Sequence, residues 1–155
     1  MLSQKFKTLL ERIKEIVKSK RDKEEKLKEI CVLLESEIPH YNWVGFYLVD
    51  PEKKNELVLG PFVGEPTEHV RIPFGAGICG QAAERKLTFI VQDVSKETNY
   101  LSCSPEVKSE IVVPIFNKNR EIVGELDIDS HHLEPFKEED REFLENVCKI
   151  VSELF

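Results

Sequence analysis

The sequence predicts an α+β fold in which helices pack against a sheet made mainly of hairpins. Apolar residues recur at helical spacing near both ends of the chain, whereas short runs rich in β-branched and aromatic residues fill its middle. The last two of these runs, 110–116 and 122–128, are joined by a turn at 117–120. So short a connection pairs two strands side by side, which favours an α+β sandwich over a doubly wound parallel sheet.

Two helices are expected before the sheet and one after it. The first spans residues 3–19, where apolar side chains repeat every three or four positions. The second carries Leu27 and Leu34 on its inner face and ends before Pro39, because the residue that precedes a proline disfavours helical backbone angles. The last helix is expected over about 137–154.

Strands and loops alternate between these helices. Besides the final hairpin, the sequence predicts strands over 42–49, 56–59, 69–72 and 88–91. Two glycines and two prolines predict a loop over 60–66, and a short helix over 81–85 follows a glycine-rich turn. A polar loop over 95–105 leads into the final hairpin.

Length and composition place the chain among globular proteins of one domain. Of its 155 residues, 41% are hydrophobic and 33% are charged, so it is neither disordered nor membrane-spanning. No apolar run approaches the roughly 20 residues of a transmembrane helix, and the charged N-terminus has no signal-peptide pattern, so we expect a cytoplasmic protein. The net charge of −7 argues against a nucleic-acid partner, which normally requires a basic face.

Two of the four cysteines, Cys79 and Cys103, lie outside any amphipathic helical pattern. Cys79 lies among glycines at the start of a helix, where backbone N–H groups lower the pKa of a thiol. By itself it is better explained as a small residue that fills a tight turn. Cys103 lies in a polar loop where no apolar pattern explains it, so the two thiols together indicate a redox pair. Cys31 and Cys148 are expected in the core.

Acidic residues follow on the predicted strands, where Glu110 opens one and Asp127 and Asp129 end the next. Because side chains alternate along a strand, the two aspartates share a face, and their repulsion is expected to raise the pKa of one of them. A solvent-exposed strand end is the alternative, and it is the better explanation for Asp129 alone. Trp43 and Tyr47 share a face of the first strand, either as core packing or as an apolar wall that holds a methyl group or a cation.

Six short strings in the same order resemble the free methionine-(R)-sulfoxide reductases, a family of small single-domain GAF proteins. The strings are 43–47 (WVGFY), 57–62 (LVLGPF), 71–75 (RIPFG), 77–80 (GICG), 109–114 (SEIVVP) and 126–130 (LDIDS). The resemblance implies one GAF domain over 1–155, with helices over 1–39 and the sheet, pocket and C-terminal helix over 40–155. In that fold an antiparallel sheet carries the N- and C-terminal helices on one face and a ligand pocket on the other.

The resemblance also implies roles within the pocket. It makes Cys103 the cysteine that attacks the sulfoxide and Cys79 the cysteine that then forms a disulfide with it. Glu110, Asp127 and Asp129 correspond to the family's pocket carboxylates. Either Asp129 or Glu110 protonates the sulfoxide oxygen, and the remaining carboxylates hold the ammonium group of the substrate. No metal or organic cofactor is implied, only an external dithiol such as thioredoxin as the reductant.

The chain keeps the family's aromatic wall, as Trp43 and Tyr47, but departs from the family at two other places. Many members carry a third cysteine ten residues before the one matched by Cys79, and this chain has His69 there, which we expect on the surface of a strand. In the loop that carries the attacking cysteine, the family's glycine-histidine pair and following aspartate are replaced by residues 99–102 and Ser104.

Two other functions stay open at this point. One is a non-enzymatic GAF module that binds a small ligand and signals through its terminal helices. The other is a redox sensor whose Cys79–Cys103 disulfide reports oxidants without turnover. A pure binder has no use for Cys103, which favours the enzyme. The long first helix lies outside the matched strings and suits a homodimer contact.

Overall fold

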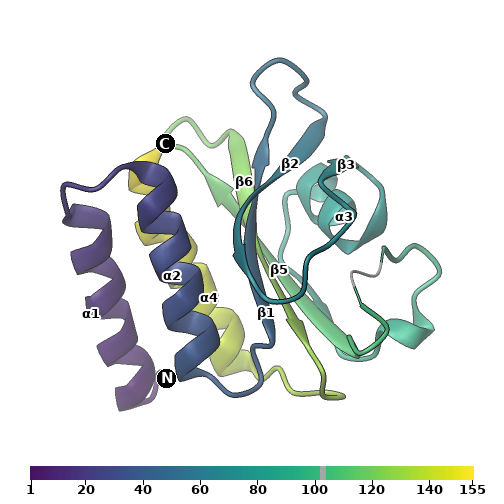
Figure 1. Ribbon diagram of the computed structural model, residues 1–155, viewed down its shortest axis with the longest axis horizontal. Coiled ribbons are helices and arrows are strands. Elements are labelled where there is room, and N and C mark those ends of the chain that lie inside the picture. The colour runs from purple at the N-terminus through teal and green to yellow at the C-terminus, as the bar shows by residue number, and fades with distance from the viewer. Residues whose placement is uncertain (102–103) are drawn as a thin grey trace.

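Residues 1–101 and 104–155, which this computed structural model describes, form a six-stranded antiparallel sheet with helices on both faces (Figure 1). The strands lie in the order β3-β2-β1-β6-β5-β4, and each neighbouring pair is antiparallel. Their bounds are β1 Trp43–Val49, β2 Glu56–Val63, β3 Arg71–Pro73, β4 Phe89–Val91, β5 Ser109–Phe116 and β6 Ile122–Ser130. The predicted α+β class with an antiparallel sheet is confirmed.

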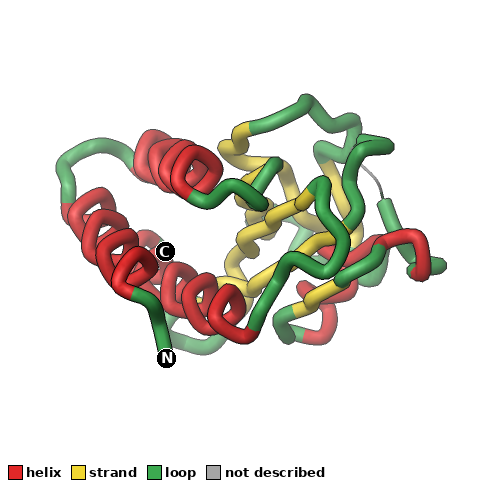
Figure 2. Tube along the Cα trace, turned by 90° about the horizontal axis from the view of Figure 1, so that it is seen from below, coloured by secondary structure: helices red, strands yellow, loops and turns green. Residues whose placement is uncertain are grey.

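The terminal helices cover one face of the sheet, and a short helix covers the other (Figures 1 and 2). The first group is α1 Gln4–Lys18, α2 Lys23–Glu37 and α4 Glu138–Val151, and the short helix is α3 Gly77–Arg85. α2 and α4 pack on the sheet, and α1 packs on these two helices from outside. The apolar stripes of the three helices form the larger core with the sheet, as the resemblance implies. Within the described residues, no helix is long and apolar enough to cross a membrane.

The alternation of side chains along β6 separates the two faces. Leu126 and Ile128 point into the core under α1, α2 and α4. Asp127 and Asp129 point the other way and line a small cavity together with residues of α3. The same strand therefore supplies both the apolar core and a row of acidic groups.

A buried carboxylate fixes the start of α4. Asp140 accepts a hydrogen bond from the Tyr41 hydroxyl at 2.6 Å and from the Lys137 backbone N–H at 2.9 Å. The Nε2 atom of His40 lies 3.0 Å from the same carboxylate. These contacts join the first turn of α4 to the segment that enters β1.

Several boundaries differ from those expected from the sequence, most of all around β2, β3 and α3. Residues 60–63, expected in a loop, continue β2, because Phe62 and Val63 pair with β1. β3 pairs only with the first three residues of β2, so the rest of β2 lies near an edge of the sheet, where Pro61 needs no partner for its missing N–H. α3 begins four residues earlier than expected, and β3 begins at Arg71 rather than at residue 69.

Candidate active site

A glycine-rich turn brings Cys79 against the sheet. Gly77 has a φ of +63°, which L side chains rarely adopt, and a Cβ added to Gly80 would lie 2.6 Å from the carbonyl oxygen of Pro73. Glycine at position 80 therefore lets α3 approach β3 closely. Cys79 lies in the first turn of α3 and is 5% exposed. The predicted tight turn around Cys79 is confirmed.

The loop that leads toward Cys103 is tied to this turn. The Asn99 side chain accepts a hydrogen bond from the Gly77 N–H at 2.8 Å and donates one to the Gly75 carbonyl at 2.7 Å. Leu101, two residues farther on, lines the same cavity as Cys79. Cys103 itself lies outside the described residues, so its pairing with Cys79 stays a prediction.

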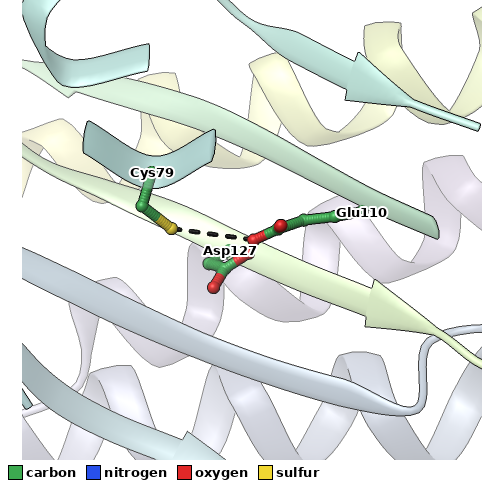
Figure 3. Close-up of side chains that lie close together, drawn as sticks. All are labelled: Cys79, Glu110 and Asp127. Carbon is green, nitrogen blue, oxygen red and sulfur yellow. Dashed lines mark hydrogen bonds between the residues drawn. The ribbon is translucent and has the colours of Figure 1, made fainter. Parts of the chain in front are cut away.

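Carboxylates from two strands meet the Cys79 thiol (Figure 3). Glu110 on β5 lies opposite Asp129 on β6, and Asp127 lies on the same face of β6. The Cys79 thiol donates to Glu110 Oε2 over 3.7 Å, and one ligand atom from each of Cys79, Glu110 and Asp127 lies within 4.8 Å of the other two. The three acidic residues are at most 5% exposed, so a solvent-exposed strand end, the alternative for the aspartates, is wrong.

A small cavity lies beside these groups. Tyr47, His69 and Leu101 line it together with Cys79 and the carboxylates. Its volume of about 20 Å³ is room for about one water molecule. None of the described residues that line it is a lysine or an arginine. His69 lies in the loop before β3, so its expected place on the surface of a strand is wrong.

Burial and like charges dominate the titration of these groups. Burial raises the pKa of the Cys79 thiol well above its usual value. Negative charges nearby raise it further, those of Asp127, Glu125, Glu110 and Asp129. The expectation that the helix N-terminus lowers this pKa is wrong, because desolvation and the carboxylates outweigh the helix N–H groups. The pKa of Asp127 is raised as well, and burial is the main cause. The sequence led us to expect a raised pKa in one of the two aspartates, but from the repulsion between them.

Glu125 belongs to the same acidic row, although we did not predict it from the sequence. It lies two residues before Asp127 on β6 and is completely buried. Neither of its carboxylate oxygens has a hydrogen-bond partner among the described residues. Burial, followed by the charge of Asp127, raises its pKa well above the usual value. The alternation of acidic residues at 125, 127 and 129 is the sequence signal that identifies it.

The two aromatic residues of β1 lie on the α3 side of the sheet, with ring centroids 6.5 Å apart. Tyr47 lines the cavity, and its hydroxyl donates to the His69 carbonyl at 2.8 Å. Trp43 stacks on Phe62 at 5.5 Å and donates its Nε1–H to the Glu65 carbonyl at 2.9 Å. It is not among the described residues that line the cavity, and it meets the site only through its ring contact with Tyr47.

The remaining two cysteines lie in the core under the helices, as predicted. Cys31 and Cys148 are both buried in the cluster that α1, α2 and α4 form with the sheet. Burial raises the pKa of each thiol. Both lie on the opposite face of the sheet from Cys79, so they are matched controls for thiol substitutions.

Comparisons with known sequences agree with this geometry. The family profile of the GAF domain matches residues 20–155. The chain is 44% identical over 111 residues to the free methionine-R-sulfoxide reductase of Saccharomyces cerevisiae, and this match covers 72% of the chain but only 61% of the yeast protein. It is 40% identical over 118 residues to the protein of the same name from Escherichia coli, which covers 76% of the chain and 68% of that protein.

A solved structure extends the likeness to three dimensions. It is the X-ray structure of free methionine-R-sulfoxide reductase from Neisseria meningitidis in complex with its substrate. The two folds superimpose with a TM-score of 0.90 at 39% identity, over 97% of this chain and 87% of the other. Likeness of this extent in both sequence and fold leads to one conclusion: the chain belongs to the GAF-domain family of free methionine-R-sulfoxide reductases.

Proposed function

We propose that this chain reduces free L-methionine-(R)-sulfoxide to methionine. The observation that carries the proposal is the buried Cys79 thiol in contact with the carboxylates of Glu110 and Asp127 at a small cavity. This arrangement combines a redox-capable thiol with carboxyl oxygens that suit an ammonium group. The yeast, Escherichia coli and Neisseria relatives are each named free methionine-R-sulfoxide reductase, and the choice of substrate in this proposal follows from that name.

The acidic row suits the α-ammonium group of a free amino acid. Asp127 Oδ1 is buried and has no hydrogen-bond partner among the described residues, so an incoming ammonium group stabilises an oxygen that is otherwise unsatisfied. A methionine sulfoxide within a peptide lacks that charge, so we propose that these carboxylates select the free amino acid. The indole of Trp43, expected from the resemblance to hold the methyl group, does not line the cavity, so we propose that the ring of Tyr47, on which it stacks, offers the apolar wall.

The proposed chemistry begins at Cys103. Its thiolate attacks the sulfoxide sulfur while Asp129 or Glu110 protonates the oxygen. The hydroxyl then passes from the methionine sulfur to the Cys103 sulfur, and the bond between the two sulfurs breaks. Methionine leaves as the reduced thioether, and Cys103, oxidised by the same two electrons, becomes a sulfenic acid. The Cys79 thiol condenses with this sulfenic acid, which forms a disulfide and releases water. An external dithiol of the thioredoxin type reopens the disulfide by exchange, so no metal or organic cofactor takes part.

The environment of Cys79 supports the resolving role over the attacking one. A thiol with a strongly raised pKa holds its proton and is a poor first nucleophile at neutral pH. During condensation that proton has to pass to a base. Glu110 Oε2, which accepts the thiol's hydrogen bond at 3.7 Å, is placed to receive it.

Turnover of the purified, reduced protein tests the proposal. The substrates are free L-methionine-(R)-sulfoxide, its (S) epimer and a peptide that contains methionine sulfoxide, each with dithiothreitol as the reductant. We expect methionine from the free (R) form alone, loss of turnover in Cys103→Ser, and turnover retained in the core control Cys148→Ser. Folded, reduced protein that releases no methionine would favour the ligand-binding module or the redox sensor. A single GAF domain, a homodimer and a cytoplasmic location stay predictions.

A further inference from the structure

Cys79, Glu110 and Asp127 converge from three elements onto one buried point, and we refer to them as the thiol–carboxylate cluster (Figure 3). One ligand atom from each residue lies within 4.8 Å of the other two. In a tetrahedral zinc site, sulfur and oxygen ligands lie about 3.5 Å apart, given metal–ligand lengths of about 2.3 and 2.0 Å. The distance of 3.7 Å between Cys79 Sγ and Glu110 Oε2 is close to that value.

A second observation points to a ligand that binds carboxyl oxygens. Asp127 is only 4% exposed, and its Oδ1 atom has no hydrogen-bond partner among the described residues. Glu125, the next residue on this face of β6, has two such oxygens. Buried carboxylates are normally paired with a cation, hydrogen-bonded or bound to a metal. The described residues that line the cavity include no lysine or arginine to neutralise them.

We propose that the thiol–carboxylate cluster binds a thiophilic divalent cation of the Zn²⁺ class. A thiolate with two carboxylates suits Zn²⁺ and disfavours Mg²⁺ and Ca²⁺, which prefer sites with oxygen ligands alone. The small cavity beside the cluster has room for a water as the fourth ligand. On binding, Cys79 loses its thiol proton to solvent and becomes a thiolate ligand, and no electron is transferred.

Occupation by the metal has a consequence for the reductase site. This consequence rests on the proposed function, because it uses Cys79 as the resolving thiol and Asp127 as an ammonium partner. A bound metal takes the Cys79 thiolate and the Asp127 carboxylate as ligands. The substrate can then no longer contact them, so substrate and metal compete for the site. The thiol–carboxylate cluster thereby makes the reductase sensitive to free Zn²⁺.

Cobalt binding to the reduced 155-residue chain tests the site directly, because thiolate-to-Co²⁺ charge transfer gives a near-ultraviolet absorption band. We expect the band in the wild type, in the core control Cys148→Ser and in Cys103→Ser. We expect no band in Cys79→Ser or Cys79→Ala. A band that persists in both Cys79 variants, or that disappears in Cys103→Ser, would overturn the proposal, and so would its absence from the wild type.

Zinc affinity, measured by competition with a chromophoric chelator, tests the carboxylate ligands. Loss of a hydrogen-bonding neighbour of a metal ligand weakens binding by about 10–100-fold, so we expect at least that loss in Asp127→Asn. An unchanged affinity in folded Asp127→Asn would count against the site. Thermal unfolding of the metal-free variants shows that each one is folded.

The two proposals fail separately. Turnover of free methionine sulfoxide in chelator-treated protein that shows no cobalt band would refute the metal site alone. A Cys79-dependent cobalt band in protein that does not turn over would refute the proposed function alone.

Discussion

Replacing Asp140 tests how the terminal helix is held to the sheet. Asp140→Ala removes the acceptor for the buried Tyr41 hydroxyl and for the Lys137 N–H, and it removes the contact with His40. A buried donor left without a partner costs about 1–3 kcal/mol, and loss of a helix cap costs about 1 kcal/mol. We therefore expect the free energy of unfolding to fall by about 2–4 kcal/mol at neutral pH.

The same substitution is expected to change the pH dependence of stability. Burial alone would raise the pKa of Asp140, but hydrogen bonds from His40, Tyr41 and the Lys137 N–H outweigh it and hold the pKa below its usual value. A carboxyl whose pKa is lower in the folded state stabilises the protein above its unfolded pKa of about 3.9. That stabilisation is lost as the pH falls through the folded pKa. The difference between the wild type and Asp140→Ala should therefore shrink in acid.

Urea unfolding followed by circular dichroism measures both effects, at neutral pH and again near pH 3, below the unfolded pKa. Glu142→Ala, an exposed substitution on the same helix, is the matched control and is expected to change stability by about 0.5 kcal/mol or less. A loss below about 1 kcal/mol in Asp140→Ala would refute the assigned hydrogen bonds. So would a difference from the wild type that does not shrink as the pH falls.

Four further substitutions or reactions probe the cavity side of the sheet. Gly80→Ala should lower the free energy of unfolding by about 1–3 kcal/mol in urea titrations, because its Cβ would lie 2.6 Å from the Pro73 carbonyl oxygen. An unchanged midpoint would contradict the close contact of α3 with β3. Asp127→Asn should raise the KM for the free sulfoxide by about 10–100-fold with a smaller change in kcat, because a hydrogen bond to a charged group contributes about 1.5–3 kcal/mol. An unchanged KM in steady-state assays would remove Asp127 from the ammonium site. Glu125→Leu should raise stability by about 1–3 kcal/mol in urea titrations, because it removes a buried carboxylate that has no hydrogen-bond partner among the described residues. A lower midpoint would show that Glu125 is stabilised by an interaction. Cys79 in folded, reduced Cys103→Ser should react slowly with iodoacetamide at neutral pH, because it is buried and its pKa is raised. Peptide mass spectrometry that finds it alkylated as fast as in urea would contradict the buried, protonated thiol.

Local patterns in the sequence were enough to predict most of the sheet and part of the site. The turn at 117–120 implied the pairing of β5 with β6, and alternation placed Asp127 and Asp129 on one face of β6. The glycines around Cys79 predicted the tight turn, because a side chain at position 80 has no room there. In each case the signal lies within a few residues of the feature it predicts.

The errors arose where distant residues decide the outcome. Pro61 and its neighbouring glycines indicated a loop, but pairing with β1 extends β2 as far as Val63. Pro61 is tolerated there because β3 does not pair with that part of β2. The helix N-terminus suggested a lowered pKa for the Cys79 thiol. The opposite holds, because burial, and then the carboxylates that β5 and β6 bring to the thiol, raise its pKa. Glu125 was not identified from the sequence as a buried residue, because α3, a segment distant in the sequence, covers that face of β6.

The most direct measurement of the proposed mechanism is a single turnover without a reductant. Reduced protein is mixed with an excess of free L-methionine-(R)-sulfoxide, the methionine released per chain is counted, and the cysteine linkages are mapped by peptide mass spectrometry. We predict about one methionine per chain, as one thiol pair is consumed, and a disulfide that joins Cys79 to Cys103. Release of no methionine, or one methionine with Cys79 still a free thiol, would contradict the assignment of Cys79 as the resolving cysteine.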